Sequence, residues 1–388
     1  MELCPGGGEP APCSGGMSDG YPCQETSFVS VVRASEMDGG SISDSWGWEH
    51  QRRAFAIVGH TKGTSFLDVT DACEPKYLGM MPQSASESKI WHDIKVRKDH
   101  AFVCSEAKKH GMQVFDLKRL LDMDPASASA NLDADKHYDK FGACHNMIAH
   151  AQGPYVSAVG TDTCSRGMHI IDISDPKDPQ QVGCWSEAGY VHDVHCVTYQ
   201  GPDDEHAGKE ICITSNGGGH TISVVDFTDK ENPIELARPK YPQAAYSHQG
   251  WISPDHRFYY HGDELDEGML VDQTRTIIWD IQDLDEPVII DDYLNPNSKA
   301  IGHNMYIVKG QSIMYQANYQ DGVRILDISN SADGQLVEVG YFDESPNNSG
   351  HGWAGAWNVY PFFDHGAFMI SGGKVMVLAT TNLTPAGR

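Results

Sequence analysis

The sequence predicts an all-β fold, a seven-bladed β-propeller, and three observations lead to it. A short apolar run that ends in aspartate recurs about every 50 residues, a polar pair precedes an apolar strand seven times, and no segment keeps the roughly 3.6-residue apolar period of a helix. Four short strands in a repeat of about 50 residues are the signature of a propeller blade, whereas helical solenoids repeat helices. We therefore expect seven blades of four strands each.

The polar pairs mark the start of the innermost strand of each blade. Successive pairs lie between 47 and 56 residues apart. They are Ser43-Asp44, His92-Asp93, His145-Asn146, His192-Asp193, His248-Gln249, His303-Asn304 and Trp357-Asn358. The blades are therefore expected to start near residues 43, 92, 145, 192, 248, 303 and 357.

The apolar runs that end in aspartate mark the third strands. The six aspartates are Asp68, Asp116, Asp172, Asp226, Asp280 and Asp327. In four of the six copies a glycine stands five residues before the aspartate, where a tight turn needs a permissive backbone. Because these aspartates recur in blade after blade, we expect each to bond the turn that follows it and assign them no catalytic role.

The seventh blade is one strand short, since its pattern ends after Val375–Leu378. Residues 27–32 near the amino terminus alternate like a strand, and we expect them to complete that blade and remove two exposed edges. This closure predicts a single propeller domain, residues 26–388, after a Cys-, Gly- and Pro-rich segment, residues 1–25. The insert from Asp122 to Gly142 has no apolar pattern and is expected to be a surface loop between the second and third blades.

The composition excludes several partners. The 28 Lys and Arg residues stand against 54 Asp and Glu residues, so the formal net charge is −26. A protein of this charge does not neutralise nucleic-acid phosphates or bind anionic lipid. No stretch approaches the roughly 18 continuous apolar residues of a membrane span, and hydrophobic residues at 40% are enough for a sizeable core.

The ten cysteines indicate an oxidising compartment. Their number is even, and Cys4, Cys13 and Cys23 punctuate the irregular amino-terminal segment, where Cys13 and Cys23 are disulfide candidates. A structural zinc site is disfavoured because no CxxC pair occurs. No signal peptide is visible at the amino terminus, so we expect the mature form of a secreted or cell-surface protein.

A second disulfide is predicted inside the fourth blade. If Tyr199 opposes Lys209 across the first hairpin of that blade, Cys196 opposes Cys212. Directly opposed cysteines on neighbouring strands are close enough for a cross-strand bridge. Two free buried thiols are the alternative.

A set of motifs spreads over nearly the whole chain. They are Pro12–Met17 with Tyr21–Cys23, Trp46–Trp48, Gly63–Asp71, Asp93–Val96, His110–Leu117, His248–Trp251, Asp263–Glu267, Gln316–Tyr319 and Trp357–Phe362. Together they resemble the choice-of-anchor B family of LVIVD-repeat proteins. The resemblance implies a secreted or cell-surface propeller, often held by one of several carboxy-terminal anchors, and since the sequence stops at Arg388 without one, a free or trimmed form. The family has no settled activity, and its members tend to carry arginine where this chain has His92.

One rim of the channel is expected to gather the chemistry. In a propeller the first strand of each blade lines the channel, and the turn into it shares a rim with the turn between the second and third strands. Five histidines with two aspartates are therefore candidate metal ligands: His92, His145, His192, His248, His303, Asp93 and Asp193. Further rim ligands, or a general base, are Asp44, Glu106, Asp162, Asp263 and Glu264.

Crowded, partly buried imidazoles stay neutral, because desolvation and mutual repulsion disfavour the cation, and their lone pairs can then bind a divalent metal. Nitrogen ligation suits iron, copper, zinc or manganese, and an oxygen-rich subset would suit calcium. Four histidines from separate blades also resemble, in geometry alone, the axial iron site of carotenoid-cleaving oxygenases. The alternative is structural: a polar residue at the start of an inner strand can hydrogen-bond the adjacent blade.

Three functions follow from these observations. The first is a secreted binding module whose broad face recognises an extracellular protein, a glycan or a small molecule. The second is a metal-dependent enzyme, an oxidoreductase or a hydrolase, and the third is a structural role in an extracellular layer. We favour the binding module because the sequence has no GxSxG elbow, no Ser/His/Asp order and no phosphate loop, so no catalytic residue can be assigned.

Overall fold

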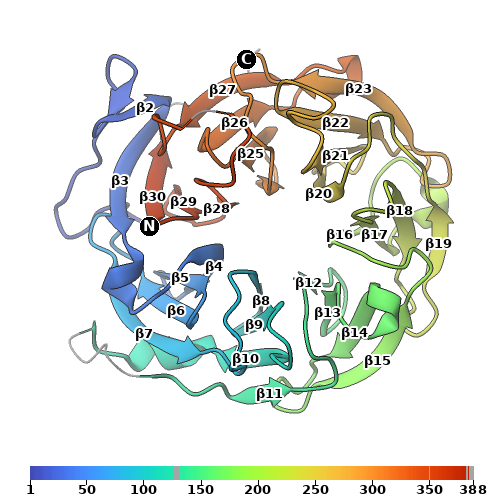
Figure 1. Ribbon diagram of the computed structural model, residues 1–388, viewed down its shortest axis with the longest axis horizontal. Helices are drawn as coiled ribbons and strands as arrows, with labels where there is room; N and C mark the ends of the chain where they lie inside the picture. Colours follow the sequence, from blue (N-terminus) through green and yellow to red (C-terminus); the bar gives the residue numbers. More distant parts are fainter. Residues whose placement is uncertain (126–130, 349, 382, 384–388) are drawn as a thin grey trace.

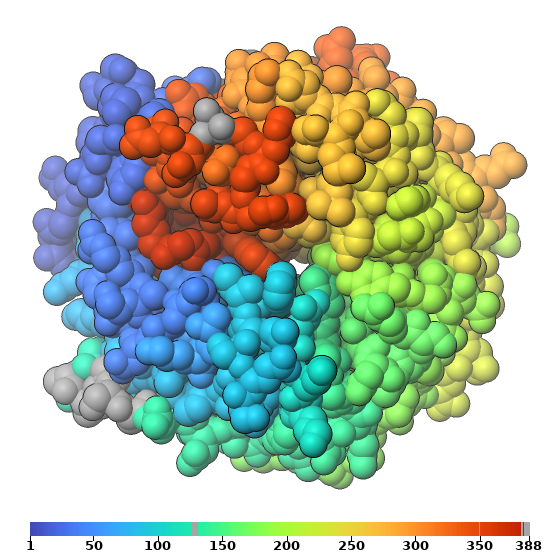
Figure 2. Space-filling model, viewed as in Figure 1, coloured from blue at the N-terminus to red at the C-terminus, as the bar shows by residue number. Residues whose placement is uncertain are grey.

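The computed structural model describes residues 1–125, 131–348, 350–381 and 383, and it confirms the seven-bladed propeller. Seven antiparallel sheets stand around one axis, each with its first strand innermost (Figure 1). The observed inner strands begin within two residues of the expected starts. Side chains fill most of the central opening that the ribbon leaves (Figure 2).

Every blade contains four strands, from the innermost at the axis to the outermost at the rim. In this order, blades 1 to 4 consist of β4 (Ile42–His50), β5 (Arg53–His60), β6 (Gly63–Asp68) and β7 (Lys76–Pro82); β8 (His92–Arg97), β9 (His100–Ser105), β10 (Met112–Asp116) and β11 (Lys136–Tyr138); β12 (Asn146–Ala149), β13 (Tyr155–Val159), β14 (Met168–Asp172) and β15 (Gln180–Trp185); and β16 (Asp193–Thr198), β17 (Glu210–Ser215), β18 (Ile222–Asp226) and β19 (Ile234–Ala237). Blades 5 to 7 consist of β20 (Ser247–Ile252), β21 (Phe258–Asp263), β22 (Arg275–Asp280) and β23 (Val288–Leu294); β24 (Met305–Ile307), β25 (Ile313–Ala317), β26 (Val323–Asp327) and β27 (Val337–Phe342); and β28 (Asn358–Tyr360), β29 (Ala367–Ser371), β30 (Val375–Thr380) and β3 (Thr26–Val32).

Helical structure in the described residues is confined to short 3-10 turns. They are η1 (Ala34–Met37), η2 (Leu117–Asp122), η4 (Cys164–Arg166), η5 (Asp204–His206) and η6 (Ser331–Asp333). None of the described helices has the length and apolar character needed to cross a membrane.

The amino-terminal strand closes the ring. Strand β3 pairs antiparallel with β30, with Thr26 opposite Thr380 and Val32 opposite Val375, as the sequence predicts (Figure 1). The preceding segment is not detached: β1 (Met17–Ser18) and β2 (Tyr21–Gln24) extend the outer edge of blade 6. Residues 1–25 therefore cover a strand edge that would otherwise be open to pairing.

The recurrent aspartates bond the turns that follow them, as expected. In all six copies a carboxylate oxygen accepts the N–H of the residue two positions later, over 2.7 to 3.0 Å. The glycines before them matter where the backbone is left-handed. Gly111 has φ +63° and Gly322 has φ +70°, and a Cβ at either would lie within 2.3 Å of a carbonyl oxygen of the fourth strand.

The insert from Asp122 to Gly142 is not wholly a loop, which corrects the expectation. Its described part contains β11, the fourth strand of blade 2, and Leu132, which is buried in the core. An outermost strand has a neighbour on one side only and faces solvent, so it needs no apolar alternation, and this is why the pattern missed it. Residues 126–130 of the insert lie outside the described residues.

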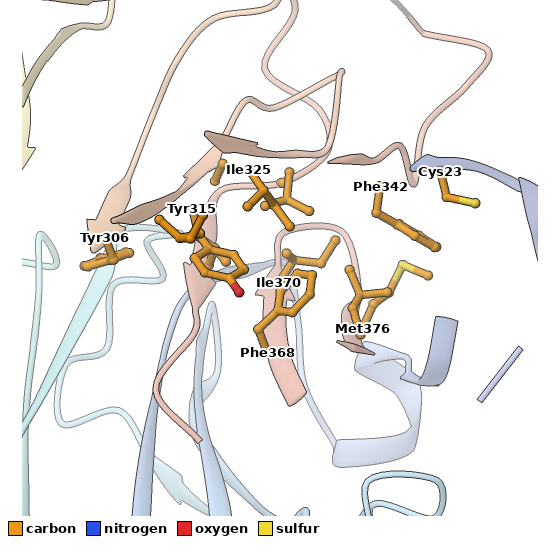
Figure 3. Close-up of a cluster of buried hydrophobic side chains, with 14 residues drawn as sticks. Cys23, Tyr306, Tyr315, Ile325, Phe342, Phe368, Ile370 and Met376 are labelled. Carbon is orange, nitrogen blue, oxygen red and sulfur yellow. The ribbon is translucent and has the colours of Figure 1, made fainter. Parts of the chain in front are cut away.

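The core lies between blades, where the faces of neighbouring sheets pack. Between blades 6 and 7, Tyr315 and Ile325 meet Phe368, Ile370 and their neighbours from the facing sheet (Figure 3). Phe368 and Ile370 are each 1% exposed. Each such interface buries aromatic and branched side chains, and together they supply the main stabilising force of the ring.

All ten cysteines form disulfides. Cys196 stands directly opposite Cys212 and bonds to it, which confirms the predicted bridge, and the two candidates Cys13 and Cys23 bond to each other. The other bridges are Cys4–Cys73, Cys104–Cys144 and Cys164–Cys184.

The disulfides should differ in their effect on stability. Cys4–Cys73 spans 69 residues and ties the amino-terminal segment to blade 1, whereas Cys196–Cys212 spans 16 residues. Because closing a longer loop removes more entropy from the unfolded chain, the double Ser variant of the first pair should lose roughly 1 kcal/mol more than that of the second. Urea unfolding of both variants measures this, and the reverse order would contradict it.

Candidate metal centre

Four histidines form an arc where consecutive inner strands begin. His145, His192, His248 and His303 come from blades 3 to 6, and the centroids of neighbouring rings lie 4.1, 4.4 and 4.3 Å apart. Three of them lie one or two residues before an inner strand, and His248 is the extra residue of a β-bulge between Ser247 and Gln249. A bulge changes the direction in which a side chain points, and here it brings the His248 ring into line with the other three.

Backbone carbonyls fix the tautomer of two of these rings. His192 Nδ1 lies 2.8 Å from the carbonyl oxygen of His248, and His303 Nδ1 bonds the carbonyl oxygen of Trp357. A carbonyl oxygen only accepts, so each Nδ1 carries the proton and each Nε2 carries a lone pair. Both imidazoles therefore present a metal-binding nitrogen away from the blade that holds them.

The carboxylate of Glu264 faces the Nε2 atoms of His248 and His303. Its oxygens lie 3.6 Å from His248 Nε2 and 3.3 Å from His303 Nε2. Ligand atoms of His192, His248 and Glu264 all lie within 4.8 Å of one another, which is the reach of a single ion. The cavity that these groups line has a volume of about 40 Å³, enough for an ion and one or two water molecules.

Burial sets the protonation states. It lowers the pKa of His303 to about 3 and the pKa values of His192 and His248 well below their ordinary value, and the neighbouring rings act in the same direction. Burial also raises the pKa of Glu264 to about 7. At neutral pH the cluster is thus three neutral imidazoles beside a carboxyl group that is about half protonated.

Tyr319 positions Glu264. The Tyr319 hydroxyl donates to Glu264 Oε1 over 3.1 Å, and its backbone adopts φ +35°, a strained conformation for an aromatic residue. Asp263 stabilises the same turn, since its carboxylate accepts hydrogen bonds from the Tyr241 hydroxyl, at 2.8 Å, and from the backbone N–H of Tyr246. Glu264 is therefore fixed on both sides.

Two further predicted residues lie beside the arc. His145 Nδ1 is 2.7 Å from Glu106 Oε1, and although burial opposes ionisation, this hydrogen bond holds the pKa of Glu106 below its usual value. His92 lines the same cavity but stands apart from the arc, against the edge of His110 at 5.6 Å. Burial lowers the pKa of His92 to about 3, and its Nε2 has no partner in the described part of the chain.

The predicted aspartates of the inner strands serve the ring itself. Asp44 accepts the N–H of Ile94 at 2.9 Å, and Asp93 accepts the N–H of Met147 at 2.7 Å, each across a blade boundary. The Lys95 ammonium bonds both oxygens of Asp93, at 2.9 and 3.0 Å. The structural alternative considered for the polar pairs thus describes these second members, and it also describes His192 and His303, whose Nδ1 atoms bond carbonyl oxygens of the next blade while their rings line the mouth.

The remaining predicted residues also lie outside the arc. Asp193 is half-buried and accepts the N–H of its neighbour Val194 at 2.6 Å, and desolvation raises its pKa to about 7. Asp162 is exposed and accepts the N–H of Gly142 at 2.8 Å. Together with Asp263, which is engaged by its own turn, these carboxylates hold backbone and are not directed at the histidines.

Sequence reasoning missed Lys95 and Tyr319 at this site. Lys95 lies two residues after Asp93 on the same strand. Because successive side chains of a strand point to opposite faces, this spacing predicts that Lys95 lies on the same face as the Asp93 carboxylate. Although burial opposes its charge, the carboxylates of Asp93, Asp44 and Asp193 hold the pKa of Lys95 above its usual value. Tyr319 follows Asn318 in a turn on the predicted rim, and this position could have identified it as a residue of the site.

Comparisons with known proteins support the fold and go no further. No family model and no curated protein matches the sequence. Among solved structures, the Cps50 (Swd1) β-propeller domain of Myceliophteria thermophila matches with a TM-score of 0.57 and 10% identity, over 92% of this chain and 100% of that one. A Bacteroides fragilis protein assigned as a 6-phosphogluconolactonase matches with a TM-score of 0.53 and 13% identity, over 77% of this chain and 84% of that one.

Lys95 should stabilise the channel by compensating buried carboxylates. Replacing it by methionine leaves Asp93, Asp44 and Asp193 facing one another, and we expect Lys95→Met to cost about 3–5 kcal/mol in urea unfolding. Adding Asp93→Asn should recover part of this loss, because the amide oxygen can still accept the Met147 N–H. Lys177→Met, at an exposed position, is the control; a loss no larger than the control's would refute the compensation.

Proposed function

We propose that this protein is an extracellular β-propeller binding module that holds a divalent transition-metal ion at the mouth of its channel. The ligands are His192, His248 and Glu264, whose ligand atoms lie within 4.8 Å of one another, and His303, whose Nε2 lies 3.3 Å from Glu264; His145 stands beside them. One observation carries the proposal: ligand atoms of His192, His248 and Glu264 all lie within 4.8 Å of one another, so a single ion could reach all three. His303 Nε2, which bears a lone pair, faces the same carboxylate at 3.3 Å, a contact that either the carboxyl proton or a cation would bridge.

The donor set favours some metals over others. Three imidazole nitrogens and one carboxylate suit zinc, iron, copper or manganese. Calcium prefers six to eight oxygen ligands, and the nearby oxygens of Asp44 and Asp93 are already bonded to backbone N–H groups. Calcium is therefore the weaker candidate at this mouth.

The extracellular location is supported by five disulfides, because such bonds persist in oxidising compartments. Membership of the choice-of-anchor B family is part of the same proposal, and the ring of seven blades agrees with it. The partner on the broad face would be an extracellular protein, a glycan or a small molecule. A purely structural role in an extracellular layer would not need the histidine arc.

A metal-dependent enzyme, oxidative or hydrolytic, is the second candidate. It is favoured by Glu264, whose pKa of about 7 is that of an effective general base at neutral pH. The cavity of about 40 Å³ limits such chemistry to small reactants or to groups that enter from the rim. The small volume is the reason we place binding first.

Metal analysis tests the proposal directly. Protein prepared without a histidine tag and dialysed against zinc or iron(II) should retain about one equivalent of metal. His248→Ala and Glu264→Gln should each lower the affinity by at least about tenfold, since each removes one ligand. Elemental analysis of the dialysed proteins measures this.

The matched control is His100→Ala, because His100 begins β9 at the opposite end of the blades. It should bind metal like the parent protein. Retention of less than about a tenth of an equivalent by a correctly folded parent would refute the site. Circular dichroism checks the fold of each variant.

The pH dependence of metal binding should report the unusual protonation states. Below pH 7 the Glu264 carboxyl is protonated and must lose that proton when the metal binds, while the His303 ring, with a pKa of about 3, is already neutral. Affinity should therefore be full above about pH 7 and fall by about tenfold per pH unit between 6.5 and 5. Glu264→Gln should abolish this slope. A fall of a thousandfold per unit would mean that the histidines titrate normally.

A further inference from the structure

A larger cavity lies at the other end of the channel. Its volume is about 550 Å³, within the range of roughly 300–1,000 Å³ that holds small organic ligands. The inner strands β16, β20 and β24 begin at the histidine mouth and run to this cavity, which their last residues line. The two openings therefore belong to opposite faces of the ring.

Two imidazoles in the wall are fixed as hydrogen-bond donors. His195 Nδ1 accepts the N–H of Ile252 at 3.0 Å, and His256 Nδ1 accepts the N–H of Gln200 at 2.9 Å. A nitrogen that accepts an N–H carries no proton, so each neutral ring holds its proton on Nε2. Burial lowers the pKa of His195 to about 3 and also lowers the pKa of His256, which keeps both rings neutral.

The floor of the cavity is aromatic. The His195 ring stacks on Trp251 with centroids 3.6 Å apart and planes 18° apart, and Phe362 lies 6.2 Å from Trp251 at 29°. All three side chains line the cavity and are only partly buried. Stacked rings of this kind offer a flat apolar surface to another planar group.

The charge of the cavity is opposite to that of the protein. Among the described residues no aspartate or glutamate lines it, although the chain has 54 such residues, and its one charged lining residue is Lys309, which is exposed. The nearest carboxylate in sequence, Asp255, is turned to the Ser253 hydroxyl at 2.6 Å and to the Arg257 N–H at 3.2 Å. The cavity thus offers N–H donors and a positive charge in an otherwise acidic molecule.

We infer that this cavity is a binding site for a small planar aromatic carboxylate. Its ring would lie on the Trp251 and Phe362 surface, and its carboxylate would accept from the imidazole N–H groups and from Lys309. A cationic ligand would be repelled by the Lys309 ammonium and could not accept from the imidazole N–H groups, and a purely aliphatic ligand would not use the flat floor. The inference is independent of the metal at the other mouth.

Calorimetric titration with 2-naphthoate, on the full chain treated with a chelator, tests the site. We expect one molecule to bind, and 2-naphthalenemethanol to bind about tenfold more weakly, since it lacks the charge-assisted hydrogen bonds. Lys309→Met should bring the two affinities to within about threefold of each other. Lys177→Met, on an exposed turn of blade 3, is the charge-matched control and should change neither.

A second variant blocks the cavity without altering its charge. Thr198→Phe, at the end of β16 in the cavity wall, should abolish 2-naphthoate binding while leaving metal binding at the other mouth intact. The inference would be overturned if 2-naphthoate did not bind, if Thr198→Phe bound it like the parent, or if 2-naphthylmethylammonium bound equally well. A circular dichroism spectrum equal to that of the parent protein would show that Thr198→Phe is folded.

Discussion

The inner strands of the seven blades meet around one axis, and the polar groups that they bring there must be satisfied by the next blade. Asp44 and Asp93 do this by accepting a backbone N–H across the boundary, and Gln249 does it with both ends of its amide, to the N–H and the carbonyl of Met305. These bonds hold blade 1 to blade 2, blade 2 to blade 3 and blade 5 to blade 6 in a fixed rotation. The positions of the side chains at the mouth of the channel depend on these bonds between blades.

The histidine arc follows from that constraint. Once neighbouring blades are held in register, residues one blade apart in sequence stand side by side, and rings about 4 Å apart result. Carbonyl oxygens on the next blade accept the Nδ1–H of His192 and of His303. The same contact that joins two blades thereby leaves a lone pair at Nε2, so the assembly of the ring also determines how these imidazole nitrogens are presented at the mouth.

The repeat made most of this predictable. Spacing placed the blade starts and the histidine rim, because those features recur with the blade, and the missing last strand together with the alternation of residues 27–32 placed the closing strand. The roles within each polar pair were not predictable, since adjacent residues of a strand point in different directions and the bulge at His248 alters that alternation. Lys95 and β11 were not predicted for a related reason. Lys95 is a single charge that does not recur with the blade, and β11 is an outer strand with little buried surface.

The closing strand also has a consequence for the order in which the blades fold. Thr26 pairs with Thr380, so the last sheet joins two segments that are almost the whole chain apart. Six blades can form from consecutive hairpins as the chain emerges, but the seventh must wait until β30 is available. Until then β3 carries an unpaired strand edge, and protection of that edge becomes the vulnerable stage of biogenesis.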